Sequence, residues 1–349
     1  MHDRDDMDWF ERLTGFREST WLETRANLEV TGRSLRSRVN GAVYGIGTLE
    51  LVSLQALRDR VRTSTGARPL AGRLSVGIVQ GDVRAMHRAP ANASALFQVA
   101  SQFNLLEMVG PQVTPEHGVA IYASDRTQGP ACAIAAGAAT IYRNYLAPVG
   151  GQAGQTRDRQ LDGLAPLGAA LAASTGLPVE ALWTMRNGYA LCSREGLDAI
   201  GGLLSTLDEA GIDTLRGMLC IGLHHDVEVT DMPKATDAAG PVVSQAFCSA
   251  LPVAYGHVPA RHWQPFATLV LEAAYEATLL AAVARAQAGA SDRVLLTLLG
   301  GGAFGNDDAW IHHALRRALR MSADHALDVK LVSYAEPDAA LRATAAAFT

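Results

Sequence analysis

A glycine-rich loop in the C-terminal third of the chain has the residue types that hold phosphate groups. It follows the apolar run Val294–Leu299 and precedes a helical pattern that begins at Asp308. Glycines let backbone N–H groups approach a ligand without a Cβ clash, and such amides with a following helix N-terminus hold phosphate oxygens. The alternative is a tight strand-to-helix turn with a packing phenylalanine. The loop consists of Gly300, Gly301, Gly302, Ala303, Phe304, Gly305 and Asn306.

The spacing of the glycines in this loop excludes two known classes of phosphate-binding motif. The loop lacks the Gly-Lys-Ser/Thr of a P-loop and the spaced glycines of a dinucleotide-binding turn. In a phosphate site of this kind, Phe304 can cover an adenine or a ribose ring. The sequence therefore predicts a phosphate-binding loop with an aromatic cover.

A second polar loop, residues 124–130, leads into a segment rich in alanine and glycine. The small side chains of that segment let a helix lie very close to a sheet or to a ligand. Asp125 and Gln128 can contact a sugar or a substrate side chain. Alternatively, Asp125 forms a salt bridge with Arg126 or with Arg143.

A third candidate lies where the apolar run Ala95–Ala100 ends in a polar turn. Asn104 carries both a donor and an acceptor, so its amide suits the hydroxyls of a ribose. An asparagine in this position also stabilises its own turn. The sequence leaves both interpretations open.

A cluster of carboxylates around residue 228 is the fourth candidate. In an extended chain Asp226 and Glu228 share one face, and His225 and Asp231 share the other. Carboxylates can bind a guanidinium group or position a water molecule as general bases. The alternatives are a solvated acidic edge and a metal site. A metal is disfavoured because the adjacent His224 and His225 point in opposite directions and lack a histidine partner four residues away.

Nucleophilic catalysis finds little support in this sequence. There is no Gly-x-Ser-x-Gly elbow. Cys132 follows a glycine and a proline, but its apolar neighbours would raise the pKa of its thiol rather than activate it.

The composition excludes several classes of protein. The 349 residues are 48% hydrophobic and 19% charged, which excludes a disordered chain. The net charge of −5 indicates no nucleic-acid partner and no anionic membrane partner. Four separated cysteines indicate buried thiols in a reducing compartment. The acidic N-terminus does not resemble a signal peptide, and no apolar run reaches the ~18 residues that span a bilayer. We expect a soluble cytoplasmic protein.

Short apolar runs that alternate with helical patterns must position these loops. This alternation predicts an α/β sandwich with a mostly parallel sheet, whose ligands bind beyond the carboxyl ends of the strands. The predicted strands are 74–79, 95–100, 119–122, 188–192, 218–223, 242–253, 294–299 and 327–334. The predicted helices are 131–145, 196–210, 266–287 and 308–320. The first 70 residues are expected to form a separate appendage.

The order of these loops resembles the macro domain family, which binds ADP-ribose. The resemblance rests on the Gly-Asp pair that ends at Asp82, the strand that leads to Asn104, and the loops 125–130 and 300–306. In that family the Asp contacts adenine and the Asn lies near the distal ribose. The sequence departs from the family in lacking its Asn-Ala-Ala-Asn motif and its triple-glycine first loop, and in the long segment 150–240.

These departures are similar to the MavL-type, arginine-specific macro domains. The similar runs are 97–107, 125–130, 140–145, 228–231, 244–255 and 298–306. The resemblance implies a three-layer α/β/α sandwich with a mixed, mostly parallel sheet. It implies an N-terminal helical extension (1–70) packed on a macro-like catalytic domain (71–349) with an enlarged 150–240 insertion.

The resemblance also implies an activity and a set of site residues. Members of the group remove ADP-ribose from arginine side chains, including those of ubiquitin, without a metal or another cofactor. The implied partners are ADP-ribose or an ADP-ribosylated protein, and the oligomeric state is left open. Two other functions remain: an ADP-ribose reader that does not cleave, and a hydrolase of a free ADP-ribose metabolite. The implied catalytic residues are Asp226, Glu228, Asp231 and Asp125. The implied substrate-binding residues are Asp82, Gln98, Ser101, Asn104, Glu107, Thr127, Gln128 and Gly129, with the whole loop 300–306.

Overall fold

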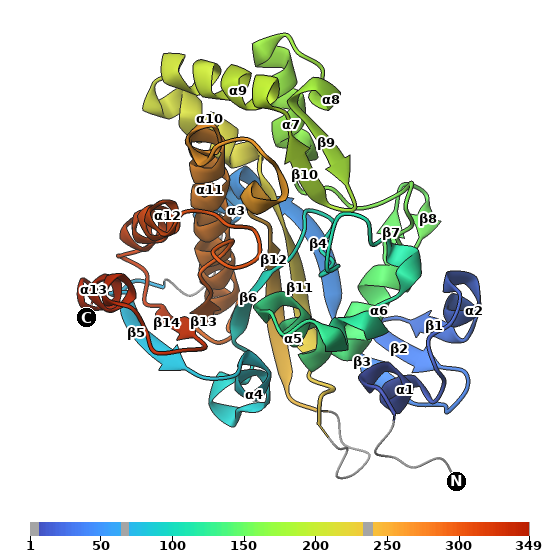
Figure 1. Ribbon diagram of the computed structural model, residues 1–349. Coiled ribbons are helices and arrows are strands. Elements are labelled where there is room, and N and C mark those ends of the chain that lie inside the picture. The colour runs from blue at the N-terminus through green and yellow to red at the C-terminus, as the bar shows by residue number, and fades with distance from the viewer. Residues whose placement is uncertain (1–6, 64–69, 233–239, 349) are drawn as a thin grey trace.

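A seven-stranded sheet forms the centre of the computed structural model, which describes residues 7–63, 70–232 and 240–348 (Figure 1). Its strands are β4 (Thr48–Ser53), β5 (Ser75–Gln80), β6 (Leu96–Ala100), β11 (Cys220–Glu228), β12 (Val242–Cys248), β13 (Arg293–Leu296) and β14 (Asp328–Ser333). They lie in the order β4-β11-β12-β6-β13-β14-β5. β11 runs antiparallel to both of its neighbours, and the other pairs in the sheet are parallel.

Helices cover both faces of this sheet (Figure 1). One face is covered by α3 (Leu54–Thr63), α9 (Arg194–Thr206), α10 (Glu209–Met218), α11 (Ala260–Gln287), α12 (Asp308–Met321) and α13 (Ala339–Ala346). The other is covered by α4 (Val83–Arg88), α5 (Gln128–Ala135) and α6 (Gly137–Tyr145). The predicted α/β sandwich with a mixed, mostly parallel sheet is therefore confirmed.

Strand β6 shows how the sequence builds these layers. Leu96 packs into the core that contains α11, whereas Phe97 and Val99 pack into the core beneath α4 and α5. Successive side chains of a strand point to opposite faces. Because both faces are buried, the strand is mostly apolar rather than alternating, and its polar residue, Gln98, is buried with a hydrogen bond to Thr278.

The N-terminal segment is not the purely helical extension that the sequence predicts. After two short helices and a small sheet of its own, the chain forms β4, which pairs with β11 in the central sheet. Only Val52 of this strand is buried, so the sequence shows no alternation that would mark it. The additional elements are α1 (Trp9–Thr14), α2 (Trp21–Ala26), β1 (Leu28–Thr31), β2 (Ser34–Ser37) and β3 (Val43–Gly45). Residues 1–6 and 64–69 of the predicted extension lie outside the described residues, and the domain boundary at residue 70 stays a prediction.

The enlarged segment 150–240, of which residues 233–239 lie outside the described residues, contains helices, a hairpin and the strand β11, which is second from one edge of the central sheet. Figure 1 shows its helices and a hairpin in yellow-green at the top of the molecule. Its elements before α9 are α7 (Ala165–Thr175), α8 (Val179–Leu182), β9 (Trp183–Arg186) and β10 (Tyr189–Cys192), and a two-stranded turn, β7 (Pro148–Val149) with β8 (Gln152–Ala153), precedes them. The same segment also supplies β11, so it is not an insertion outside the sheet.

The predicted strand at 119–122 is wrong, because this run forms a 3-10 helix, η4 (Ala120–Ser124). The carboxylate of Glu18 accepts hydrogen bonds from the N–H groups of Val119 at 2.8 Å and Ala120 at 2.7 Å. These bonds satisfy the donors at the start of the helix, a partner that the local sequence does not reveal. The other 3-10 helices are η2 (Pro90–Asn92), η3 (Pro115–His117) and η5 (Val253–Tyr255).

Helix α11 is long and apolar enough to cross a membrane by length and composition alone. In the fold it is a core helix, and 89% of its most apolar window is buried against the sheet and the neighbouring helices. A helix that is apolar on all sides is typical of a buried position in a large core.

Candidate functional site

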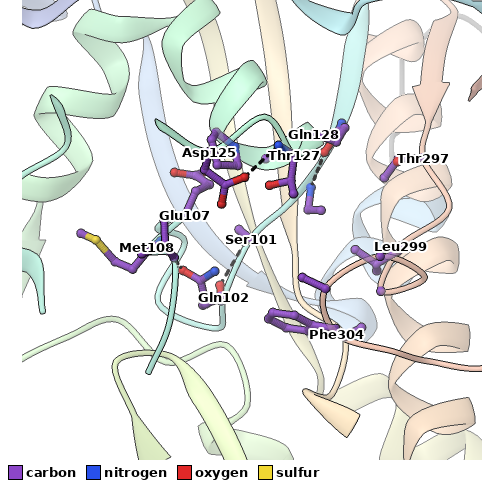
Figure 2. A pocket seen from close by; sticks show the side chains of 18 of the residues that line it. Ser101, Gln102, Glu107, Met108, Asp125, Thr127, Gln128, Thr297, Leu299 and Phe304 are labelled. Atoms are coloured by element: carbon purple, nitrogen blue, oxygen red, sulfur yellow. Dashed lines mark hydrogen bonds between the residues drawn. The ribbon is translucent and has the colours of Figure 1, made fainter. Parts of the chain in front are cut away.

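A cavity opens in the central sheet where β13 separates from β6 (Figure 2). β13 pairs with β6 only as far as Phe97, whereas β12 stays paired with β6 up to Ala100. The gap lies at the carboxyl ends of these parallel strands, the edge where α/β proteins bind ligands. Together with its open mouth the cavity holds about 760 Å³ of empty space. The predicted site residues that line it are Ser101, Glu107, Asp125, Thr127, Gln128, Gly129, Gly300, Gly302, Ala303 and Phe304.

At this gap the side chain of Gln128 makes the hydrogen bonds to β6 that a neighbouring strand would otherwise make. Its side-chain oxygen accepts the N–H of Ala100 at 2.9 Å, and its side-chain nitrogen donates to the carbonyl of Gln98 at 2.8 Å. These are the backbone groups that β13 would pair with if it continued alongside β6. The predicted substrate contact of Gln128 is therefore replaced by a structural one, which fixes the start of α5 against the sheet.

The N-terminus of α5 presents backbone donors to the cavity. The side chain of Thr127, the N-cap residue, makes no capping hydrogen bond. Within the described residues, no acceptor is bonded to the N–H groups of Gln128 and Gly129, which both line the cavity. Such a helix terminus favours an anion. Gly129 makes the approach possible, because a Cβ on it would lie 2.0 Å from the carbonyl oxygen of Ala100.

The glycine loop forms the wall on the β13 side of the cavity. Gly300 has φ +80°, and a Cβ on it would lie 2.5 Å from the Cβ of Ala250, so only glycine fits there. Within the part of the chain that the structure describes, no acceptor is bonded to the N–H groups of Gly302, Ala303 and Phe304. These three amides are therefore available to phosphate oxygens.

The helix that follows the loop does not share in this site. Asp307 caps α12 by accepting the N–H of Ala309 at 2.8 Å, and Asp308 adds a second acid to its first turn. None of the residues of α12 lines the cavity, and the helix N-terminus that faces the cavity is that of α5. The structure therefore does not bring the N-terminus of α12 to the cavity.

Three aromatic rings line one part of the cavity. Tyr189 from β10, Tyr255 from η5 and Phe304 from the glycine loop have ring centroids 5.1 to 5.7 Å apart. Tyr189 is buried and donates its hydroxyl to the carbonyl of Met108 at 2.6 Å. The predicted aromatic cover at Phe304 is thus one member of a larger apolar wall that suits a flat ring.

A constrained turn after β6 carries a buried carboxylate to the cavity. Leu105 has φ +65°, which is a rare conformation for a leucine. The side chain of Asn104 accepts the N–H of Leu106 at 3.1 Å, and that of Gln102 accepts the N–H of Met108 at 2.8 Å. These bonds hold the backbone on both sides of Glu107. Asn104 itself does not line the cavity, so the interpretation that it stabilises its own turn is the one seen.

Glu107 is the ionisable group whose environment is most unusual at this site. Its side chain lines the cavity yet is only 2% exposed. Burial raises the pKa of Glu107 to about 7, and the neighbouring cation Arg143 and the hydroxyl of Tyr122 oppose the rise. A carboxyl group that titrates near neutral pH in a cavity suits general acid–base catalysis.

Asp125 supplies the second carboxylate. One of its oxygens accepts the N–H of Thr127 at 2.8 Å, which fixes the loop that enters α5. Neither predicted salt bridge of Asp125 is found among the described residues, because Arg143 pairs with Glu107 instead. Figure 2 draws Asp125 and Glu107 toward the same part of the cavity, away from Phe304.

The predicted catalytic trio Asp226, Glu228 and Asp231 does not reach the cavity. β11 is antiparallel to β12, so Glu228 lies beside Val242 at the start of β12, whereas the cavity lies beyond its end. These three carboxylates therefore lie at the opposite edge of the sheet, because the carboxyl end of an antiparallel strand points away from the carboxyl end of its neighbour.

Each of these three carboxylates has a different partner. Glu228 accepts the N–H groups of Gly45 at 2.7 Å and Gly240 at 3.0 Å. Asp231 forms a bidentate pair with Arg84 at 2.7 and 2.9 Å. Asp226 is half-exposed and lies 3.5 Å from Arg285. All three positions are explained by structural contacts.

Several other predicted contacts also lie outside the cavity wall. Asp82 caps α4 by accepting the N–H of Arg84 at 2.9 Å. Gln98 is buried and donates to Thr278 at 3.1 Å. Asn306 donates to the carbonyl of Leu251 at 2.8 Å and holds the glycine loop. The predicted residues that do not line the cavity are Asp82, Gln98, Asn104, Gly301, Gly305, Asn306, Asp226, Glu228 and Asp231.

The structure adds residues that the sequence interpretation misses. Tyr189 could have been found, because Asn187-Gly188 is the signal of a tight hairpin turn and both residues have positive φ, +48° and +79°. Tyr255 lies past the end of a predicted strand and gives no such signal. The additional lining residues are Ala100, Gln102, Met108, Val109, Pro130, Tyr189, Ala250, Tyr255, Thr297, Leu298 and Leu299.

Metal ligands do not gather in the described part of the chain, where no three His, Cys, Asp or Glu side chains come together. Metal-free chemistry nevertheless stays a prediction. At this site the groups that the structure does provide are amides, rings and two carboxylates.

Comparison with known proteins finds likeness only among solved structures. No protein-family model and no curated protein matches the chain. It is similar to poly(ADP-ribose) glycohydrolase from Deinococcus radiodurans in complex with ADP-ribose, with 13% identity over 95% of this chain and 96% of that chain and a TM-score of 0.43. It is also similar to poly(ADP-ribose) glycohydrolase from Thermomonospora curvata, with 13% identity over 94% and 97% and a TM-score of 0.44.

Proposed function

We propose that the protein is a hydrolase that binds ADP-ribose and cleaves the glycosidic bond between its distal ribose and an attached group. One observation carries this proposal: the carboxyl group of Glu107, whose pKa is raised by burial, shares a cavity with two sets of backbone amides that have no acceptor among the described residues. The amides suit a diphosphate, and the carboxyl group suits acid–base catalysis at a sugar.

The cavity divides into parts with different chemistry. The amides of Gly302–Phe304 on one wall and of α5 on the other would hold the diphosphate between them. The aromatic wall of Tyr189, Tyr255 and Phe304 would pack against the nucleoside. The distal ribose would then lie at the remaining part, where Glu107 and Asp125 are.

The reaction on an arginine conjugate follows from these positions. The C1–N bond breaks, and its electron pair stays on the guanidinium nitrogen, which leaves as neutral guanidine. Positive charge develops on the ribose, and the carboxylate of Asp125 stabilises it, as in glycoside hydrolysis. Water attacks C1, Glu107 takes a proton from that water, and it then returns the proton to the guanidine. The products are ADP-ribose and protonated arginine.

Arginine as the attached group is part of the proposal. The side chains that line the cavity include two carboxylates and no lysine or arginine, so the site favours a substrate whose attached group is cationic before the bond breaks. A modified protein such as ubiquitin and a cytoplasmic location belong to the proposal as well. A reader and a hydrolase of a free metabolite are the alternatives that the same cavity would serve.

Release of ADP-ribose from defined substrates tests the function. Wild-type protein is incubated with an arginine-linked peptide conjugate, an oxygen-linked peptide conjugate and O-acetyl-ADP-ribose, and free ADP-ribose is measured by chromatography. Faster release of ADP-ribose from the arginine conjugate than from the other two substrates supports the proposal. Tight calorimetric binding of ADP-ribose with no release from any substrate would instead establish a reader.

We expect Asp231→Asn to leave turnover of the arginine conjugate unchanged. The residue pairs with Arg84 near the start of β12 and does not line the cavity. Steady-state kinetics of the variant and the wild type make the measurement. A loss of turnover of about tenfold or more, with the fold intact by circular dichroism, would restore the acidic trio as catalytic.

We expect Gly302→Leu to weaken ADP-ribose binding by about tenfold or more, which is about 1.4 kcal/mol, without a loss of stability. A Cβ at Gly302 meets nothing within 4 Å, so the added side chain enters open space beside the cavity. Calorimetry measures the affinity, and thermal unfolding measures the stability. Gly202→Leu on α9, whose Cβ also meets nothing within 4 Å, is the matched control and should bind as the wild type does. Equal affinity of both variants would show that the loop does not touch the ligand.

A further inference from the structure

Arg143 and Glu107 form an ion pair inside the protein core. The Arg143 side chain is fully buried, and its Nη2 lies 3.3 and 3.4 Å from the two carboxylate oxygens of Glu107. Its Nε donates to the carbonyl of Leu105 at 3.1 Å, and its guanidinium carbon lies 3.9 Å from the ring centroid of Phe247. Arg143 therefore binds both the carboxylate of Glu107 and the constrained turn at Leu105 that precedes it.

Stability alone does not explain this pair. Burying two charges is expensive, and a well-packed apolar pair of similar volume is often as stable or more stable. The distances of 3.3 and 3.4 Å exceed those of strong charge-assisted bonds. The Nη1 of Arg143 is buried, and it has no hydrogen-bond partner among the described residues. The pair is thus a costly arrangement beside the cavity.

The other titratable groups around Glu107 are uncharged at neutral pH or already engaged. Tyr122 accepts the N–H of Glu107 at 3.1 Å, and burial raises the pKa of its hydroxyl well above its usual range. Burial likewise raises the pKa of the Cys132 thiol. Asp125 lines the same cavity and is bonded to the N–H of Thr127. Arg143 is therefore the cation that acts on Glu107.

We propose that Arg143 is a positioning residue for Glu107, which fixes the orientation of its carboxylate toward the cavity. This inference rests on the proposed function. Tyr122 assists, because its hydroxyl also hydrogen-bonds to the carboxylate and lowers its pKa.

The sign of the effect follows from the charges. Burial favours the neutral carboxylic acid, and the guanidinium favours the carboxylate. Without Arg143 the acid form would persist to higher pH, and Glu107 would no longer accept a proton from water near pH 7. Removing the positive charge should raise the pKa of Glu107 by about one to three units.

Carbon-13 NMR of glutamate-labelled protein reads this pKa directly, with the Glu107 signal assigned by its loss in Glu107→Gln. Arg143→Met should raise the titration midpoint, and the limb of kcat/KM against pH that reports Glu107 should move in the same direction. Arg143→Lys keeps the charge but loses the planar fork, so it should restore the midpoint while kcat stays below the wild-type value. Tyr122→Phe should raise the midpoint by less.

The outcomes separate the inference from the proposed function. An unchanged midpoint in folded Arg143→Met overturns the inference. If that variant does not fold, an unchanged midpoint in Tyr122→Phe together with wild-type kcat in Arg143→Lys overturns it instead. If the midpoints move as expected but the wild type releases no ADP-ribose from any conjugate, the proposed function fails and the electrostatic role of Arg143 stands.

Discussion

Glu107→Gln should lower the turnover of an arginine-linked ADP-ribose conjugate by about 10²–10⁴-fold, the usual contribution of one general acid–base group. The amide has nearly the shape of the acid but cannot take a proton from water. Affinity for free ADP-ribose should stay close to that of the wild type, because the phosphate and nucleoside contacts are on other walls of the cavity. Single-turnover release of ADP-ribose and calorimetry measure the two effects separately.

The matched control is Glu180→Gln on α8, which makes the same chemical change at an exposed position away from the cavity. It should retain full turnover. Asp125→Asn should also slow the reaction, since its charge would stabilise the ribose cation. Wild-type turnover in Glu107→Gln would contradict the assignment of Glu107 as the acid–base residue, whatever the conjugate.

Gly129→Ala should both destabilise the protein and abolish ADP-ribose binding. A Cβ at this position would lie 2.0 Å from the carbonyl oxygen of Ala100 and 3.1 Å from the Cγ of Glu107, so α5 must move away from β6. Overpacking of this kind costs about 1–3 kcal/mol of the free energy of unfolding. The movement would also withdraw the amides of the helix N-terminus and disturb Glu107.

Urea unfolding followed by circular dichroism measures the stability, and calorimetry measures the binding. Gly202→Ala on α9 is the control, because nothing lies within 4 Å of its added Cβ. It should stabilise the protein by about 0.8–1 kcal/mol, as expected for glycine to alanine in a helix. An unchanged unfolding midpoint in Gly129→Ala would mean that α5 does not approach the sheet as closely as the structure shows.

The glycine loop shows how far local pattern can lead. A continuous apolar run before Gly300 marks a buried parallel strand, and the small residues after it mark a loop at the ligand-binding edge. The structure places that loop on the cavity wall. The same reasoning does not extend to the helix that follows, because Asp307 caps it by accepting the N–H of Ala309 and none of its residues lines the cavity.

Glutamine and asparagine side chains show why roles are harder to predict than positions. Gln128 reaches the cavity as expected, yet its amide completes the edge of β6. Asn104 lies in the expected turn, yet it stabilises that turn and points its other end to Gln160 at 2.8 Å. The backbone groups that Gln128 satisfies lie 28 and 30 residues away in the chain. The backbone group that Asn104 satisfies lies in its own constrained turn.

Apolar runs and glycines are local signals, and they suffice to predict the layers, the two loops that enclose the cavity and the aromatic residue Phe304. Which carboxylate meets those loops depends on how the strands pair. The residues of β11 do not reveal whether it runs parallel or antiparallel to β12. Because it is antiparallel, Asp226, Glu228 and Asp231 lie at the opposite edge of the sheet. Glu107 takes their place because a turn at Leu105 and a distant arginine, Arg143, hold it there, and both depend on the packing of the whole chain.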